Sequence, residues 1–194
     1  MTPLDPGSDE ALAARAAGGD ERAFGELVRR HKEPLYRLMR RYTGNPDQAY
    51  EAAHEAFIAA WRALGRYDPN RSFMAWLRTI AFNKARDLAR RRMVHRFLLG
   101  SDALEEEGAA IAAEEGSDAE SQLAAQEEMR ALDRAIARLP GKLKEALVLT
   151  AFEGCSQKEA GEILGVSEKT VETRVYRARK ILAVTLDPSL RPRA

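Results

Sequence analysis

Residues 156–182 read SQKEAGEILGVSEKTVETRVYRARKIL and predict two short helices joined by a tight turn. Ser156 and Glu159 have the S-x-x-E spacing of a capping box, in which each side chain satisfies a backbone amide at the start of the first helix. Gly165 ends that helix, because glycine adopts the left-handed backbone conformation at little cost. Ser167 is then placed to cap the second helix. The stretch therefore predicts a helix-turn-helix.

The predicted second helix has an apolar face and, opposite it, a largely basic one. Its apolar positions recur at helical spacing and are Val171, Val175, Ala178 and Leu182. A helix of this width fits the major groove of DNA, where polar side chains reach base edges and cationic ones hold phosphates. A solvated basic face on an ordinary bundle helix is the alternative interpretation. The candidate residues for duplex DNA are Lys169, Thr170, Glu172, Thr173, Arg174, Tyr176, Arg177, Arg179 and Lys180.

The charge of the 194-residue chain is unevenly distributed, although its net charge is only +1. Residues 1–19 carry a net −2, residues 20–97 a net +8, residues 98–128 a net −10 and residues 129–194 a net +5. Two basic bodies joined by an acidic connector indicate a polyanionic partner for the bodies and a separate role for the connector.

Several classes of site and location are disfavoured by composition. Cys155 is the single cysteine, so a disulfide within the chain and a zinc site built from several thiolates are excluded. The sequence shows no transmembrane-length apolar run and no signal peptide, so we expect a soluble, cytoplasmic protein without membrane insertion. The sequence shows neither a phosphate-binding loop nor a nucleophile with a matching base, so it does not predict an enzyme. No cofactor is expected.

Residues 1–19 predict a loose arm with one marginal helix, and the first basic body after it begins with two helices. Asp20 can cap a helix that continues to about residue 42 and contains Pro34, which predicts a kink. A second helix over residues 47–64 places Tyr50, Ala53, Phe57, Trp61 and Leu64 on one face. Its other side carries an E-x-x-H pair of the kind that binds iron in carboxylate bundles, but that chemistry needs two such pairs and the sequence has one. The candidate residues for a protein contact are Glu51, His54, Glu55 and Arg62.

The loop 65–71, GRYDPNR, precedes a long helix that closes with three arginines at 90–92. A helical wheel places Arg78, Phe82 and Arg86 away from the core, and an exposed aromatic ring among guanidinium groups suits single-stranded nucleic acid. A basic surface with one partly buried phenylalanine is the alternative. The candidate residues of the loop and helix are Tyr67, Asn70, Arg71, Arg78, Phe82, Asn83 and Arg86.

The complete pattern predicts an all-α protein with two small helical domains joined by a flexible acidic linker. Two further helices, one closed by Pro140 and the next ended by Gly154, complete a four-helix domain around the helix-turn-helix. The expected divisions are an arm at 1–19, a first domain at 20–97, a linker at 98–122, a second domain at 123–186 and a tail at 187–194.

From residue 139 to residue 182 the chain resembles region 4 of the extracytoplasmic-function sigma factors, the small two-domain promoter-specificity subunits of bacterial RNA polymerase. The shared residues include Thr170, Val171, Arg174, Arg177 and the following Ala-Arg. EAFIAAWRAL and FMAWLRTIAFNKARDLARRR, with the loop between them, are similar to region 2. The usual D-x-x-Q-E clamp motif of the family reads EAAHE at 51–55, so histidine replaces glutamine. Phe82 and Glu172 also depart from the usual residue types, and promoter sequences cannot be transferred.

The resemblance implies partners and a mechanism. The 47–64 helix would dock on the clamp of core RNA polymerase, and the second helix of the helix-turn-helix would read the minus-35 element of double-stranded promoter DNA. The loop 65–71 and the helix after it would capture a melted strand at the minus-10 element. An anti-sigma factor is a further partner whose existence is left open. A free-standing dimeric helix-turn-helix regulator of the response-regulator output type shares the carboxy-terminal motif and is the alternative.

Overall fold

The computed structural model describes residue 5, residues 7–99 and residues 119–187, and it is helical, with no β-strand among these residues. The described residues form two compact units, one drawn from residues 1–39 and 47–102 and the other from residues 40–46 and 103–194. The prediction of an all-α protein with two helical domains is confirmed. Residues 100–118, the greater part of the predicted linker, lie outside the described residues, as does the tail from residue 188.

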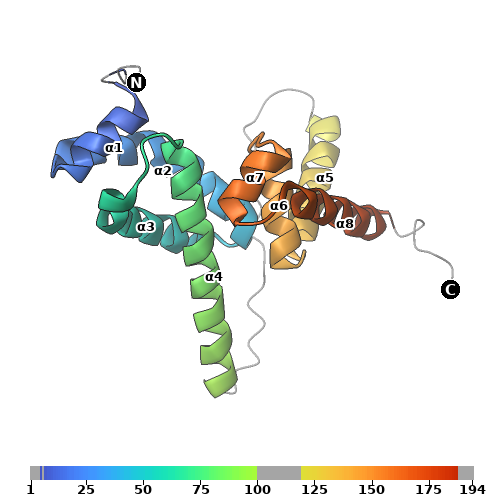
Figure 1. The fold of residues 1–194 in the computed structure, drawn as a ribbon. Helices are drawn as coiled ribbons and strands as arrows, with labels where there is room; N and C mark the ends of the chain where they lie inside the picture. Colours follow the sequence, from blue (N-terminus) through green and yellow to red (C-terminus); the bar gives the residue numbers. More distant parts are fainter. Residues whose placement is uncertain (1–4, 6, 100–118, 188–194) are drawn as a thin grey trace. The chain divides into compact units, whose positions relative to one another are not determined.

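The first unit contains α1 (Asp9–Ala17), α2 (Glu21–Thr43) as far as Met39, α3 (Pro46–Ala63) from Asp47 on, the short 3-10 helix η1 (Leu64–Arg66) and α4 (Phe73–Leu99), which Figure 1 shows in sequence order from blue to green. Five alanines of α3 are buried, at positions 49, 52, 53, 56 and 60. Side chains this small let neighbouring helices approach closely. The Phe24 and Trp61 rings, 4.9 Å apart, join α2 to α3, and the His31 and Phe73 rings, 5.6 Å apart, join α2 to α4.

The amino-terminal arm differs from its prediction. Residues 9–17 form the expected helix, but it is not loose, because Leu12, Ala13 and Ala16 are buried and α1 packs on η1 and α4. Ser8 caps the helix by accepting a hydrogen bond from the Ala11 amide. Propensity alone makes nine residues a marginal helix. Here the burial of one apolar face supplies the missing stability.

Tyr50 and Trp61 also differ from their predicted place on the packed face of α3. Tyr50 is 69% exposed and Trp61 is 38% exposed, whereas Ala53, Phe57 and Leu64 are buried as expected. The core-facing side of α3 therefore consists of its buried alanines and Phe57, whereas Tyr50 and Trp61 lie outside it. η1 follows α3 directly and includes the first two residues of the loop 65–71.

The second unit contains α5 (Ala119–Ala137), α6 (Gly141–Ala151), α7 (Gln157–Leu164) and α8 (Glu168–Leu186). α8 packs on α5, α6 and α7, and its Val171, Val175, Ala178 and Leu182 are buried. This confirms the predicted four-helix domain with the helix-turn-helix at its carboxyl end. Its core positions α8 so that the opposite face is left exposed.

Candidate nucleic-acid interface

The turn of the helix-turn-helix is fixed by the caps that the sequence predicts. The Ser156 hydroxyl accepts a hydrogen bond from the Glu159 amide at 3.1 Å, and the Glu159 carboxylate accepts one from the Ser156 amide at 2.8 Å. Gly165 ends α7 with a φ of +67°, in the left-handed region. Ser167 then caps α8 by accepting from the Thr170 amide at 3.2 Å. The start of α8 is thereby held in a defined direction.

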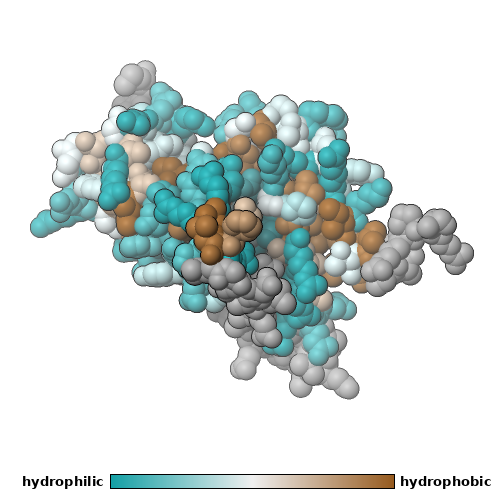
Figure 2. All heavy atoms as spheres, turned by 90° about the horizontal axis from the view of Figure 1, so that it is seen from below, coloured by the Kyte–Doolittle hydropathy of each residue, from teal (hydrophilic) through white to brown (hydrophobic). Residues whose placement is uncertain are grey.

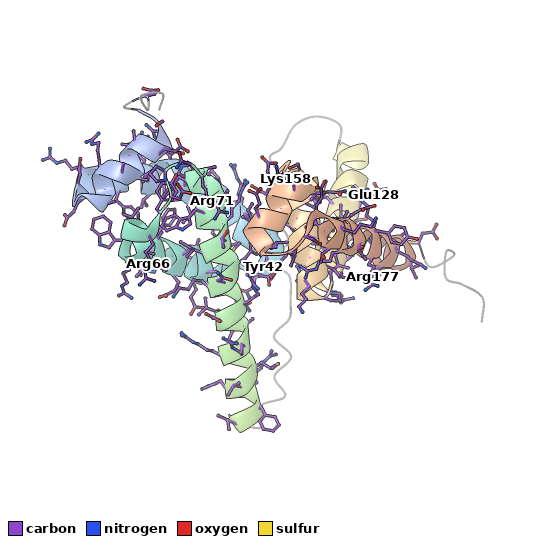
Figure 3. The ribbon with its side chains drawn as sticks, viewed as in Figure 1. Tyr42, Arg66, Arg71, Glu128, Lys158 and Arg177 are labelled. Atoms are coloured by element: carbon purple, nitrogen blue, oxygen red, sulfur yellow. The ribbon has the colours of Figure 1, made fainter. Side chains whose placement is uncertain are left out.

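The exposed face of α8 carries most of the predicted DNA-contact residues. Lys169, Glu172, Thr173, Tyr176, Arg177, Arg179 and Lys180 are exposed, whereas Thr170 and Arg174 are half-buried. Tyr176 is 68% exposed, and Arg177 projects from the helix in Figure 3. Glu172 pairs with Lys169 at 2.7 Å, which partly neutralises its charge beside the basic residues. A rigid helix therefore presents hydrogen-bond donors along its length, as a helix in a major groove requires.

The loop 65–71 is a folded turn that leaves two polar side chains exposed. The Asp68 carboxylate accepts hydrogen bonds from the Asn70 amide and the Asn70 side chain, both at 3.0 Å. The Arg71 amide donates to the Asp68 carbonyl at 3.0 Å. Asn70 and Arg71 are exposed at the point where α4 begins, and Figure 3 labels Arg71 there.

The Tyr67 side chain is buried and hydrogen-bonded to the backbone of this loop. Tyr67 is 9% exposed, and its hydroxyl donates to the Arg71 carbonyl at 2.5 Å. The Tyr67 ring packs against those of Phe73 and Trp76, at 5.8 and 5.1 Å between centroids, so the structure buries a residue that the sequence places among the nucleic-acid contacts. Burial, and after it the charges of Glu10, Asp68 and Asp9, raises the pKa of Tyr67 to about 12.

Phe82 contradicts the prediction of an exposed ring on α4. Its side chain is fully buried, with a relative exposure of 0%. Phe73, Leu77, Ala81, Ala85 and Leu88 form one buried stripe along α4, and Phe82 widens the buried face beside Ala81. A helical wheel assumes one neighbour on one side, and α4 is enclosed more widely than that. Phe82 cannot stack on a base unless the core opens.

Asn83 and Arg86 of α4 are exposed, as predicted, and Arg78 is half-buried. An Arg86 amino group donates to the Asn83 side-chain oxygen at 2.8 Å, and Arg86 Nε donates to the Phe82 carbonyl at 3.2 Å. The two side chains thus form an ordered polar pair in the same unit as the exposed loop residues.

The carboxyl end of α4 extends beyond the predicted stop at Arg92 and ends at Leu99. Its last turns expose Met93, Val94, Phe97 and Leu98, and Phe97 is 86% exposed. Figure 2 is viewed from the side to which this end points and shows hydrophobic side chains among hydrophilic ones there. The exposed aromatic ring of α4 is therefore Phe97 and not Phe82.

The predicted protein-contact residues of α3 are mostly exposed. Glu51, His54 and Arg62 are exposed and Glu55 is half-buried. Glu51 pairs with Arg92, and Glu55 with Lys84 at 3.5 Å, so both carboxylates are tied to α4. Tyr50, which the sequence places in the core, stacks on His54 with ring centroids 6.2 Å apart and 3° between planes. The i, i+4 spacing of these two rings was the signal for this exposed pair.

Metal and membrane sites find no support in the described part of the chain. Among these residues no group of three or more His, Cys, Asp and Glu side chains comes together as a metal site would require, including around Glu51 and His54. None of the described helices is long and apolar enough to span a bilayer.

Comparisons with known proteins agree with the division of the chain into two helical units. Residues 27–94 match the family model described as Sigma-70 region 2, and residues 129–182 match the one described as Sigma-70, region 4. The chain is similar to the ECF RNA polymerase sigma-E factor of Escherichia coli, with 31% identity over 188 residues, 95% of this chain and 97% of that one. It is also 42% identical to the RNA polymerase sigma factor CnrH of Cupriavidus metallidurans over 188 residues, 96% of this chain and 97% of that one. The chain belongs to the extracytoplasmic-function sigma factors.

This sigma factor is thus a promoter-specificity subunit of RNA polymerase. A solved structure, CnrH in complex with the cytosolic domain of CnrY, is similar over 93% of this chain and 97% of that one, with a TM-score of 0.67 and 36% identity. The match of residues 27–94 to region 2 leaves the free-standing helix-turn-helix regulator without support, because such a regulator shares only the carboxy-terminal motif.

Proposed function

We propose that the two units of this sigma factor divide promoter recognition, with residues 123–186 reading the minus-35 element and residues 20–97 capturing the melted minus-10 strand. The exposed donor face of α8 carries the proposal, because its opposite face is fully committed to the core of the unit. Thr173, Tyr176 and Arg177 read bases in the major groove, and flanking cations hold phosphates. The phosphate-holding residues are Lys169, Arg174, Arg179 and Lys180.

The first unit holds a base of the melted strand with the loop 65–71 and α4. Removing a base from the stack costs a few kcal/mol, which polar contacts and stacking must offset. The residues available for this are Asn70, Arg71, Asn83 and Arg86, all exposed, with half-buried Arg78 beside them. Preformed hydrogen bonds in the loop and between Asn83 and Arg86 reduce the ordering cost of binding.

The outer face of α3 docks on the clamp of core RNA polymerase. Glu51, His54 and Arg62 offer exposed charged and polar groups, and Tyr50 adds an exposed aromatic ring of the kind enriched at interface centres. We assign the chain no catalytic reaction of its own, and its place of work is the bacterial cytoplasm, where polymerase and chromosome are found.

An anti-sigma protein is a further proposed partner. The similar structure of CnrH is a complex with the cytosolic domain of CnrY, and this chain shares 36% identity with CnrH in that comparison. A protein that covered the exposed faces of α3 and α8 would block polymerase and promoter at once.

The test is transcription of fragmented genomic DNA by purified bacterial core polymerase, with and without the full chain, followed by sequencing of transcript 5′ ends. We expect new start sites that share two sequence blocks at a fixed separation. The same start sites with and without the chain would contradict the proposal. DNase I footprinting by the chain alone is the control, and we expect no protected site without polymerase.

A further inference from the structure

Helix α1 lies outside the residues that match region 2, which begin at residue 27, yet it is part of the first unit. Leu12, Ala13 and Ala16 bury its apolar face, and the helix packs on η1 and α4. η1 includes the first two residues of the loop 65–71, and α4 begins at Phe73, just after the loop ends. Figure 1 shows α1 at the same end of the helices as the start of α4.

The amino end of α1 is fixed by Asp9, which pairs with two residues of α2. One Asp9 carboxylate oxygen lies 2.6 Å from His31 Nε2, and the other lies 3.1 Å from an Arg30 guanidinium nitrogen. The same Arg30 nitrogen donates to the Gly7 carbonyl at 2.8 Å. The His31 side chain is only 14% exposed, so this contact is well shielded from water.

From His31 a continuous set of ring contacts leads to the loop. The His31 and Phe73 rings are 5.6 Å apart, and those of Phe73 and Tyr67 are 5.8 Å apart with an edge-to-face geometry. Trp76 completes the cluster, 5.8 Å from Phe73 and 5.1 Å from Tyr67. Rings held in this way have few alternative rotamers, because each occupies the space that another would need.

The last contact joins this cluster to the exposed loop. The Tyr67 hydroxyl donates to the Arg71 carbonyl at 2.5 Å, across the turn that presents Asn70. The Tyr67 hydroxyl is protonated at neutral pH, as that of any tyrosine is, and can donate this bond; burial raises its pKa further, to about 12. A displacement of Tyr67 would therefore shift the backbone of Asn70 and Arg71, and with it the position of their side chains.

We propose that α1 is a positioning element for the loop 65–71, and that the Asp9–His31 contact, acting through Phe73 and Tyr67, sets the loop's conformation for capture of a melted base. The inference rests on the proposed function of the loop. Asp9 and His31 themselves touch no DNA in this scheme. Contacts of α3 with polymerase and of α8 with the minus-35 element do not depend on them.

The experiment uses the full chain bound to core polymerase and compares Asp9→Ala with Arg15→Ala. Arg15 is the matched control, because its 2.6 Å ion pair with Asp20 also joins α1 to the start of α2 but does not lead to the ring cluster. The probes are a fluorescent single-stranded minus-10 oligonucleotide and variants of it with each base changed. Asp9→Asn keeps an acceptor for His31 and is the conservative variant.

We expect Asp9→Ala to weaken capture of the preferred oligonucleotide about threefold to tenfold, the range for loss of one or two hydrogen bonds. Its base preference flattens at one position, which a general loss of folded protein would not do. Asp9→Asn restores most of the preference, and Arg15→Ala matches the wild type. Affinity for core polymerase is unchanged in all three.

A double-mutant cycle distinguishes positioning from general destabilisation. If Asp9 acts through the loop, then Asp9→Ala has little further effect on oligonucleotide capture once Asn70→Ala and Arg71→Ala are present. Equal effects of Asp9→Ala and Arg15→Ala, or an Asp9 effect that persists in the loop variant, would overturn the inference. A wild-type chain that binds polymerase but captures no minus-10 strand would instead reject the proposed function.

Discussion

Arg177 and Lys180 lie one turn apart on the exposed face of α8, but their side chains differ in what they can recognise. Arg177 presents a planar fork that can bind two acceptors of a guanine edge, whereas Lys180 is a point charge suited to phosphate. We expect Arg177→Ala to cost about 1 to 3 kcal/mol at one minus-35 base and to relax discrimination there. Lys180→Ala should weaken all promoters evenly and reduce the salt slope by about 1.

Promoter variants with single-base changes, bound by the holoenzyme at several salt concentrations, give both quantities. Thr185→Ala is the control, since Thr185 lies near the carboxyl end of α8 and bonds to the Ile181 carbonyl of its own helix. The same base-preference profile for Arg177→Ala and Lys180→Ala would contradict the assignment.

Phe82 lies in the core of the first unit, and this position determines the effect expected of its mutation. Because the ring is fully buried, Phe82→Ala leaves a cavity and should lower the free energy of unfolding by about 3 to 5 kcal/mol. Exposed Asn83, the next residue, should leave stability within about 0.5 kcal/mol when changed to alanine, while strand opening falls. Urea unfolding and permanganate footprinting measure the two effects. A Phe82→Ala variant that is as stable as the wild type but opens promoter DNA poorly would contradict this and favour an exposed Phe82 ring that contacts DNA.

The raised pKa of Tyr67 predicts that the first unit loses stability at alkaline pH. Its pKa is raised from 10.0 to about 12, so the folded state favours the neutral hydroxyl. This contribution to stability is fully present below pH 10 and is lost as pH rises from about 10 to about 12. Tyr67→Phe should lose about 1 kcal/mol of stability at neutral pH, through the missing hydrogen bond, and should show a smaller decline over that range. Urea unfolding at pH 8 to 11 provides the comparison.

At the scale of elements, local signals predicted the helix-turn-helix well, because its caps act within three residues. The Ser156–Glu159 box, the left-handed Gly165 and the Ser167 cap are all found in the structure. α1 and the end of α4 were predicted less well. The stability of α1 comes from residues of η1 and α4 that are distant in sequence, and a wheel drawn for one helix contains no information about them.

For the site residues too, exposure could be predicted where it depends on the same helix and could not where it depends on other elements. Exposure of the α8 residues follows from the buried stripe on the same helix, so Tyr176, Arg177 and Lys180 could be placed from sequence. Tyr67 and Phe82 could not, because their burial depends on rings and helices that surround them from other elements. The contact of Asp9 with His31 joins residues 22 positions apart, and no local sequence motif predicts it.

Gly161 supports a prediction about the helix-turn-helix as an element. A Cβ at this position would lie 2.7 Å from the Val166 carbonyl oxygen, in the turn itself. Backbone atoms cannot yield as a flexible side chain does, so Gly161→Ala should destabilise the second unit by about 1 to 3 kcal/mol and weaken minus-35 binding. Gly25→Ala in α2 is the control, because its Cβ would meet nothing within 4 Å and alanine should stabilise the helix by about 0.5 to 1 kcal/mol. Thermal unfolding of both variants tests this, and a neutral Gly161→Ala would contradict it.

At the scale of the whole molecule, charge is divided between bodies and connector in a way that individual motifs do not require. Residues 20–97 carry a net +8 and residues 129–194 a net +5, whereas residues 98–128 carry a net −10. A polyanion such as DNA attracts the two basic segments and repels the acidic connector. The charges therefore favour DNA contact by the two bodies and not by the connector. The covalent connection then matters because it presents the second unit to the promoter at a high effective concentration once the first is bound.

Cleavage of the connector tests this linkage directly. With a protease site placed among residues 100–118, we expect the cut chain to retain binding of its first unit to core polymerase but to lose about 10²-fold or more in transcription that depends on the minus-35 element. The physical reason is that two independent binding events replace one binding event followed by an intramolecular one. Transcription from a promoter with its minus-35 bases changed should fall much less on cleavage, which provides the control. Equal losses on both promoters, or full activity of the cut chain, would show that the connection contributes nothing to minus-35 recognition.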